Sequence, residues 1–166
     1  LCTTPVAAER FSPVDGGVRH TSGMNLADAL AYARPIHRGA LATIKADGRP
    51  QLSNVMFAVG DDGVIRVSVT DSRAKTANMR RDPRVCLHVT ARDFWSYVVV
   101  EADADLTAVA TGPDDATVDE LVDLYRALQG EHPDWSEYRA SMVADGRLVA
   151  RLTPTRCYGA LPPRSQ

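Results

Sequence analysis

Residues 72–84 hold the densest group of side chains that could bind an anion. The segment carries five cationic residues and one acid, which gives a local net charge of +4. It directly follows a predicted strand, and Asp71 or Ser72 is placed to cap a turn of helix there. A helix N-terminus presents unpaired backbone N–H groups and the positive end of the helix dipole. Arg73 adds a bidentate guanidinium and Lys75 a point charge, so the pattern predicts phosphate binding.

A solvated basic face is the alternative interpretation of this segment, because runs of charge usually face water. Charge alone does not separate the two interpretations. The position favours the phosphate site, since a strand end, a cap and two cations fall within one helical turn.

Four further side chains could contact a ring or a phosphate. Ser53, Asn54 and Ser68 place polar groups on strands that are otherwise apolar. A solvated polar strand face is the alternative for them. Trp95 lies at a predicted strand start, where it offers a flat wall to a planar ring or packs in the core.

Several standard sites are missing from the sequence. It has no GxGxxG, Walker A, GxSxG or HExxH motif. The four histidines show no metal-ligand spacing, so no metal site is expected. His88 is interpreted as a structural or interface residue, with a catalytic role as the alternative. The acidic group within 114–123, at a predicted helix start, is assigned to stability and solubility.

The composition is that of one globular domain. The 166 residues are 45% apolar, which argues against disorder, and their net charge of −2 excludes a globally basic nucleic-acid binder. No apolar run approaches the roughly 20 residues of a membrane span, and no secretory signal is seen. Cys2, Cys86 and Cys157 have no CxxC spacing, so reduced thiols in a cytoplasmic protein are expected.

Strand signals dominate the region that must position these side chains. Asp47-Gly48 between two apolar runs predicts a hairpin, because a type I′ turn needs positive φ at both central residues. Alternating apolar residues predict further strands, joined by tight turns. The predicted strands are 40–45, 51–59, 64–70, 85–89, 97–106 and 148–158.

Helices are predicted before and late in this run of strands. Asn25 can cap the first helix, and a capping box at Thr117–Glu120 opens a second helix that Gly130 ends. An apolar stripe from Trp135 predicts a third helix that stops at Gly146. Hairpins without βαβ units indicate a mainly β, α+β fold, namely an antiparallel barrel with peripheral helices.

Two segments of this barrel resemble a known superfamily. Gly39–Val55 resembles the opening hairpin of the pyridoxamine 5′-phosphate oxidase-like split-barrel superfamily, and is most similar to its actinobacterial deazaflavin-dependent branch. The run Ser72-Arg73-Ala74-Lys75-Thr76-x-Asn78, followed by Arg81–Arg84, resembles the phosphate segment of that branch. Shorter similar segments are Trp95-Ser96-Tyr97, Leu124-Tyr125-Arg126, Gly130–Trp135 and Tyr158-Gly159. The resemblance implies that residues 24–163 form a single split-barrel cofactor-binding domain. Residues 1–23 contain Pro and Gly without periodicity, so we expect them to be a flexible arm.

The resemblance implies a homodimer with two cofactor sites at the interface between the subunits. The implied cofactor is the deazaflavin coenzyme F-420, or FMN as in relatives of the branch. The implied reaction is hydride transfer between that cofactor and a small electrophilic organic substrate, with no nucleic acid or membrane partner.

The resemblance also implies roles for site residues. The cofactor phosphate would be held by Arg73 and Lys75, with Ser72 and Asn78 in support. The ring and its side chain would be lined by Lys45, Ser53, Asn54, Val55 and Ser68. Trp95 would come from the other subunit, and Arg80 or Arg81 would meet the oligoglutamate tail.

Two other functions stay open. One is an FMN-dependent oxidase of a pyridoxine-like substrate, for which only Arg151–Pro154 is similar to the C-terminal Arg-Leu-x-Pro stretch of such oxidases. The other is a cofactor-binding or carrier protein without turnover, because the sequence offers no obvious general acid. The catalytic residues are therefore unassigned, and the candidate proton donors are Tyr97, Tyr158, Arg156 and His88.

Overall fold

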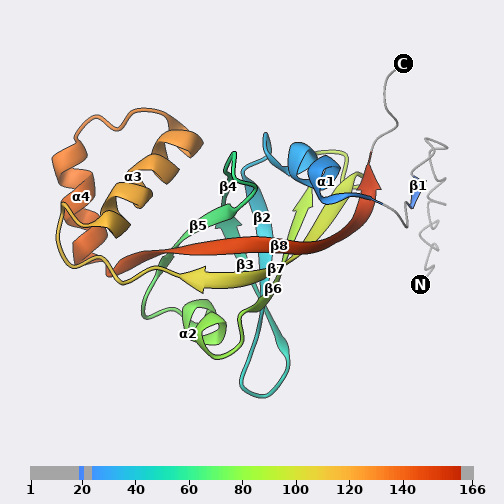
Figure 1. The fold of residues 1–166 in the computed structure, drawn as a ribbon, viewed down its shortest axis with the longest axis horizontal. Helices are drawn as coiled ribbons and strands as arrows, with labels where there is room; N and C mark the ends of the chain where they lie inside the picture. The colour runs from blue at the N-terminus through green and yellow to red at the C-terminus, as the bar shows by residue number, and fades with distance from the viewer. Residues whose placement is uncertain (1–18, 21–23, 162–166) are drawn as a thin grey trace, which may run out of the picture.

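The computed structural model describes residues 19, 20 and 24–161 (Figure 1). One antiparallel sheet has the strand order β3-β2-β6-β7-β8-β5-β4, and β1 pairs with β8. The strands are β1 (Arg19–His20), β2 (Arg38–Ile44), β3 (Pro50–Met56), β4 (Ala58–Val59), β5 (Ile65–Thr70), β6 (Arg84–Thr90), β7 (Tyr97–Leu106) and β8 (Arg147–Leu161). The predicted mainly β fold is confirmed. Apart from β1, the predicted N-terminal arm lies outside the described residues.

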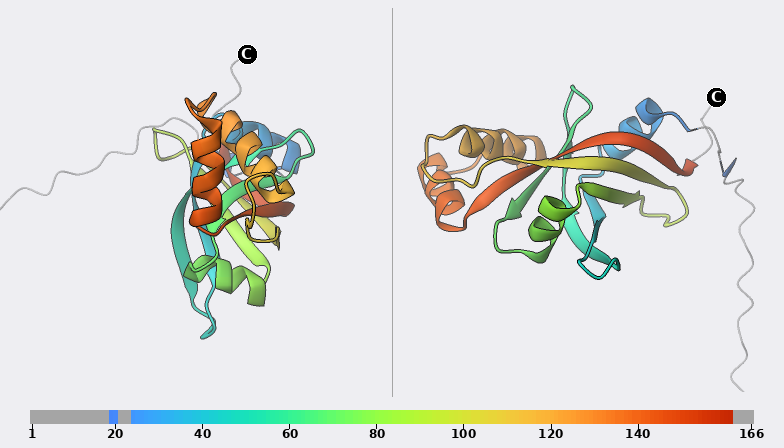
Figure 2. Two further views of the ribbon diagram at one scale, coloured as in Figure 1. Left: turned by 90° about the vertical axis from the view of Figure 1, so that its left-hand side faces the viewer. Right: turned by 60° about the horizontal axis from the view of Figure 1, so that its bottom comes forward.

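The sheet curls into a barrel that stays open between its edges. β3 is one edge strand and β4 is the other, and the curl brings β3 into contact with β5. In Figures 1 and 2, β7 and β8 run along the molecule, with α3 and α4 at one end and α1 towards the other. The opening between β3 and β5 is where the predicted polar side chains gather.

The predicted hairpin at Asp47-Gly48 is confirmed, because β2 and β3 pair along their whole length. Its predicted type I′ turn is wrong, because Gly48 has a φ of 81° but Asp47 does not have a positive φ. The Gly48 N–H donates to the Lys45 carbonyl at 2.9 Å, which closes a longer turn.

The predicted strand 51–59 divides in two at the buried Phe57. The Phe57 N–H donates to the His37 carbonyl at 3.0 Å, which ties this break to the start of β2. β3 therefore ends at Met56, and after Phe57 the chain continues as β4.

The hydrophobic core lies inside the curl of the sheet. Alternation in β5 turns one face inward, as predicted, and the same period in β6, β7 and β8 supplies the facing residues. Fully buried side chains are Leu41, Phe57, Ile65, Leu87, Val98, Val100, Leu148 and Leu152. Burial of apolar surface stabilises a fold by about 25 cal/mol per Å². The burial of these side chains therefore stabilises the curled form of the sheet.

The described residues form four helices around the sheet: α1 (Leu26–Ala33), α2 (Ala74–Arg81), α3 (Ala116–Gln129) and α4 (Trp135–Ala144). Asn25 caps α1 as predicted, with its Oδ1 accepting from the Asp28 N–H at 2.8 Å. Gly130 ends α3 at a φ of 80°. Within the described ranges, no helix is both long and apolar enough to cross a bilayer.

The predicted capping box at Thr117–Glu120 is wrong. Asp115 is the N-cap of α3, and its Oδ1 accepts from the Val118 N–H at 2.8 Å. Thr117 lies inside the helix, where its hydroxyl donates to the Ala108 carbonyl at 3.0 Å. Asp115 prevails because its second oxygen also accepts from the Thr111 N–H at 2.8 Å, which anchors the preceding loop.

Candidate functional site

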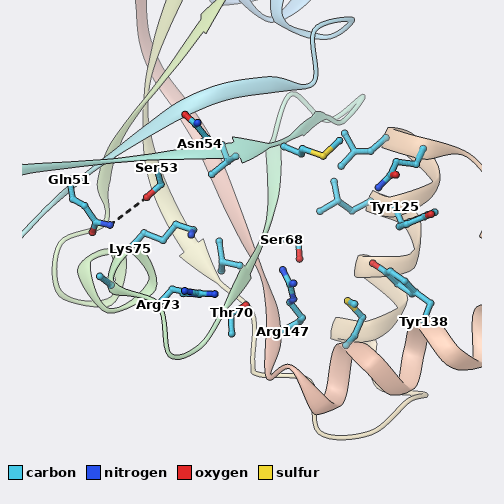
Figure 3. Close-up of a pocket in the computed structure, with 18 residues that line it drawn as sticks. Gln51, Ser53, Asn54, Ser68, Thr70, Arg73, Lys75, Tyr125, Tyr138 and Arg147 are labelled. Carbon is cyan, nitrogen blue, oxygen red and sulfur yellow. Dashed lines mark hydrogen bonds between the residues drawn. The ribbon is translucent and has the colours of Figure 1, made fainter.

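A cavity of about 800 Å³ opens at the split of the barrel (Figure 3). It lies between the edge strand β3, strand β5, the start of α2 and the α3–α4 pair. Its lining residues are Gln51, Ser53, Asn54, Val55, Met56, Ser68, Val69, Thr70, Arg73, Ala74, Lys75, Leu124, Tyr125, Leu128, Gln129, Tyr138, Met142 and Arg147. A cavity of this size suits a cofactor-sized molecule.

One side of this cavity is cationic. Arg73, Lys75 and Arg147 line it, and no carboxylate does so among the described residues. In that same part of the chain, neither Arg73 nor Lys75 has an ion-pair partner, whereas Arg147 bonds Asp145 at 3.3 Å. Burial, followed by the charges of Arg73 and Arg147, lowers the pKa of Lys75. A bound anion would relieve this repulsion.

The start of α2 differs from the sequence prediction. Neither Asp71 nor Ser72 caps the helix, because the N-cap is Arg73 and no side chain bonds the first N–H groups. Asp71 instead pairs with Arg80 in the last turn of α2. The start of α2 therefore lines the cavity with two cations and has no side-chain cap, which is an arrangement that suits a phosphate.

Three of the predicted strand residues meet at the opening. Ser53 and Val55 come from β3 and Ser68 comes from β5, so the two sides of the split contribute together. Asn54 also lines the cavity, from the exposed edge. Ser53 accepts a hydrogen bond of 3.5 Å from Gln51 (Figure 3).

Asn78 lies beneath the cavity rather than in its lining. It is buried, and its Nδ2 donates to the Gln51 Oε1 at 2.8 Å and to the Thr43 hydroxyl at 3.0 Å. Asn78 also accepts from Arg81 at 3.1 Å. It therefore joins α2 to the β2–β3 hairpin and orients Gln51, which does line the cavity.

The other predicted site residues are not brought to this cavity within the described chain. Lys45 pairs with Asp47 at 3.5 Å, Ser72 is exposed outside the lining, and Arg80 holds Asp71. Trp95 is 55% exposed in the loop after β6. The candidate proton donors also lie outside it, on the face of β6, β7 and β8 that points away from the core, and they are Tyr97, Tyr158, Arg156 and His88.

The wall opposite the cations comes from α3 and α4, and the sequence does not predict it. Tyr125, Leu128 and Tyr138 line it. Figure 3 shows Tyr125 and Tyr138 across the cavity from Arg73 and Lys75. Their helical spacing is equally typical of core residues, and nothing local distinguishes a core stripe from a cavity wall. The segment around Tyr125 belongs to the family resemblance, which was the one available signal.

The aromatic side chains of this wall are fixed by their neighbours. The Tyr138 hydroxyl donates to the Leu121 carbonyl at 3.1 Å, and burial raises the pKa of Tyr138. Tyr125 packs edge-on against Tyr138 and Trp135, with ring centroids 5.0 and 5.7 Å apart. Such a preformed wall presents its apolar surface without further ordering.

Comparison with known proteins places this architecture. The family profile described as pyridoxamine 5′-phosphate oxidase matches residues 28–160. A solved structure named "F420 Reductase" is 27% identical with a TM-score of 0.57, over 75% of this chain and 90% of that one. A conserved hypothetical protein from Mycobacterium tuberculosis is 21% identical with a TM-score of 0.66, over 87% and 91%.

A third similar structure is a pyridoxamine 5′-phosphate oxidase-related, FMN-binding protein from Nostoc punctiforme. It is 16% identical with a TM-score of 0.52, and the match covers 80% of each chain, which shows a shared fold. The family profile spans most of the described barrel, including the split and the start of α2. The chain belongs to the pyridoxamine 5′-phosphate oxidase-like split-barrel family.

Proposed function

We propose that this protein is an oxidoreductase that binds coenzyme F-420 in the cavity at the split and transfers a hydride between it and a small electrophilic organic substrate. One observation carries the proposal. Arg73, Lys75 and Arg147 surround an uncapped helix start, in a cavity that no described carboxylate lines. A phosphate-bearing cofactor supplies the missing anion.

The lining residues fit the two halves of such a cofactor. Its phosphate belongs at the first turn of α2, beside Arg73 and Lys75. Its ring belongs against the apolar surface of Val55, Leu124 and Leu128, with the hydroxyls of Ser53 and Ser68 as hydrogen-bond partners. The bound deazaflavin supplies the hydride chemistry, and this chain supplies binding, orientation and the exclusion of water.

A homodimer is part of this proposal. Several large apolar side chains are exposed on the single chain: Leu52 (70%), Met56 (40%), Phe94 (73%), Trp95 (55%) and Tyr158 (49%). A second copy covering them would bring Trp95 to the neighbouring subunit's cofactor site. Sedimentation of the purified protein is expected to give twice the mass of the 18.0 kDa chain, and a monomer would contradict this part.

FMN is the second candidate cofactor, because a structurally similar protein is described as FMN-binding and the same phosphate site would accept it. Fluorescence titration with each cofactor separates the two. We expect tight binding of F-420 and weak binding of FMN. Tight FMN binding without F-420 binding would overturn the proposal.

The same titration tests the site itself. The double variant Arg73→Gln/Lys75→Gln is expected to lose affinity for F-420 while it stays folded. Arg49→Gln is the matched control, because Arg49 lies at the hairpin end beside Asp47 and does not line this cavity. Turnover of reduced F-420 with quinones and unsaturated lactones then separates an enzyme from a carrier protein, which would bind F-420 and oxidise none of it.

A further inference from the structure

A second cavity, of about 1010 Å³, adjoins the first across the edge strand β3. The two share Asn54, Val55, Met56 and Leu128 in their linings. Arg38 pairs with Met56, and Ala40 pairs with both Asn54 and His88. Directly paired residues share a face, so this second cavity lies over the sheet face that points away from the core.

The second cavity is also cationic. Arg38 and Arg92 line it together with His37 and His88, and no described Asp or Glu does so. Most arginines in the described chain, such as Arg34 and Arg151, have a carboxylate within salt-bridge distance.

Arg38 and Arg92 have no such carboxylate partner among the described residues, and both are exposed. Arg73 in the first cavity shares this property, as do Arg81 and Arg156, which line neither cavity. Two unpaired guanidiniums over one cavity favour a ligand with a carboxylate, because each guanidinium presents a planar fork of donors.

The backbone next to both arginines is held by specific contacts. Among the described residues, the two non-glycine residues with positive φ are His37 at 56° and Phe94 at 67°. His37 directly precedes Arg38, and its Nδ1 lies 3.2 Å from the Phe57 carbonyl oxygen. Backbone strain of this kind is retained where the surrounding structure fixes it, and it gathers at functional sites.

The loop that carries Arg92 is fixed in a similar way. The Asp93 carboxylate accepts from the Ser96 N–H at 3.0 Å and from the Ser96 hydroxyl at 2.7 Å. The Tyr32 hydroxyl of α1 donates to the Ser96 carbonyl at 2.6 Å. The loop is therefore tied to the helix that precedes β2, which sets Arg92 and Arg38 over the same cavity.

We infer that this second cavity binds the substrate, and that the substrate is a small organic acid held by its carboxylate between Arg38 and Arg92. The inference rests on the proposed function, because the first cavity then holds the cofactor. β3 is the open edge of the sheet, and Asn54, Val55 and Met56 line both cavities there, so this edge is where the electrophilic carbon of the substrate would meet the cofactor ring. The substrate class is therefore an unsaturated or carbonyl compound with an anionic end.

Calorimetric titration with 3-phenylpropanoate and its neutral amide, 3-phenylpropanamide, tests this inference without turnover. The two probes have the same shape and differ in charge. We expect the protein to bind the acid at least about tenfold more tightly than the amide. In the variant Arg38→Gln/Arg92→Gln the acid should bind as weakly as the amide, whereas Arg49→Gln should keep the preference. Equal binding of both probes to the unmodified protein would overturn the inference, as would a preference that survives in the double variant.

A carboxylate could also come from the oligoglutamate tail of the cofactor. Titration of Arg38→Gln/Arg92→Gln with F-420 and with the deazaflavin riboside that lacks the tail separates the two sources. Substrate binding predicts unchanged affinity for both cofactor forms. A selective loss of F-420 affinity would assign the cavity to the tail and overturn the inference. Binding of FMN in place of F-420 would refute the proposed function alone, because the preference for the acid would persist.

Discussion

The N-termini of α2 and α3 follow opposite rules. Asp115 caps α3, accepts three backbone N–H bonds and is followed by Asp119 in the first turn. Helices α1 and α4 also begin with a capping side chain and an acidic first turn. α2 begins with Arg73, without a side-chain cap or an acid. Cations at the positive end of a helix dipole destabilise the helix. The start of α2 is therefore suited to binding an anionic ligand rather than to stabilising the helix.

α2 is held by its tertiary contacts instead. The Thr76 hydroxyl donates to the Thr70 carbonyl at 2.8 Å, and Asn78 and Met79 are buried against the sheet. These contacts leave the first turn open while they fix its position. Sites where a protein breaks a local rule and compensates elsewhere are where function is expected.

Arg73→Asp removes the difference between the two helix N-termini most directly, because it gives α2 an aspartate at the N-cap, as in α3. We expect affinity for F-420 to fall by more than about 100-fold, since a cation at the phosphate becomes an anion. Thermal stability should stay the same or rise slightly, because a cap adds about 1 kcal/mol. Fluorescence titration and circular dichroism melting measure the two effects.

Arg49→Asp is the control for this charge reversal, because it changes the net charge equally at an exposed position that lines neither cavity. It should leave F-420 affinity within about twofold of the unmodified protein. If Arg73→Asp bound F-420 normally, the phosphate would lie elsewhere. If Arg73→Asp unfolded the protein, Arg73 would be needed for folding rather than for cofactor binding.

Glu120 of α3 gives the next largest effect. Its carboxylate is bonded by Arg151 at 2.6 Å and by Arg66 at 2.9 Å. Burial alone would raise the pKa of Glu120, but these hydrogen bonds outweigh it and lower the pKa below its ordinary value of 4.5. Glu120→Gln is expected to cost about 2 kcal/mol at pH 7, measured by urea unfolding.

The lowered pKa of Glu120 also predicts how the stability of the protein changes with pH. A carboxyl whose pKa is lower in the folded state stabilises the protein fully above about pH 4.5. This stabilisation is lost as the pH falls through the folded pKa. The unmodified protein should therefore lose stability more steeply below pH 4.5 than Glu120→Gln does, and equal slopes would contradict the assignment.

Asp115→Ala tests the conventional start of α3 with a smaller effect. It removes the acceptor of the Val118, Thr111 and Gly112 N–H groups, so we expect a loss of about 1 kcal/mol or slightly more. Cofactor affinity should not change, because Asp115 lines neither cavity. Asp115→Asn is the matched variant and should recover most of the stability. Unchanged stability in Asp115→Ala would show that water replaces the cap.

Features set by neighbours in the chain could be predicted from the sequence. The hairpin at Asp47-Gly48, the alternation of β5 and the end of α3 at Gly130 follow from local turn chemistry and side-chain period. The cations of the phosphate segment are equally local. Their position at a strand end therefore predicted that Arg73 and Lys75 would line a cavity together.

Features set by distant partners could not be predicted. The carboxylate of Asp71 is taken by Arg80, nine residues later, so it does not cap α2. Tyr125 and Tyr138 have the spacing of core residues, and only the curl of the sheet makes them a cavity wall. Arg147 joins the same cavity because Thr70 and Arg147 are paired in β5 and β8.

Lys75 supplies the smallest and most specific test of the difference between α2 and α3. Burial lowers the pKa of Lys75, and the positive charges of Arg73 and Arg147 lower it further. Lys75 therefore loses its proton at a lower pH than an ordinary lysine. A phosphate prefers the charged amine, and affinity for F-420 should therefore decline, by less than about tenfold, as the pH rises through that lowered pKa. Titrations between pH 7 and pH 10 measure this decline.

Lys75→Arg separates this explanation from a general effect of pH. A guanidinium stays charged throughout the range, so its affinity should be level where that of the unmodified protein declines. The same decline in both proteins would place the titrating group outside the start of α2. A level affinity in both proteins would show that the amine of Lys75 stays charged up to pH 10, despite its burial beside two arginines. The deprotonation of Lys75 would then not affect cofactor binding in this range.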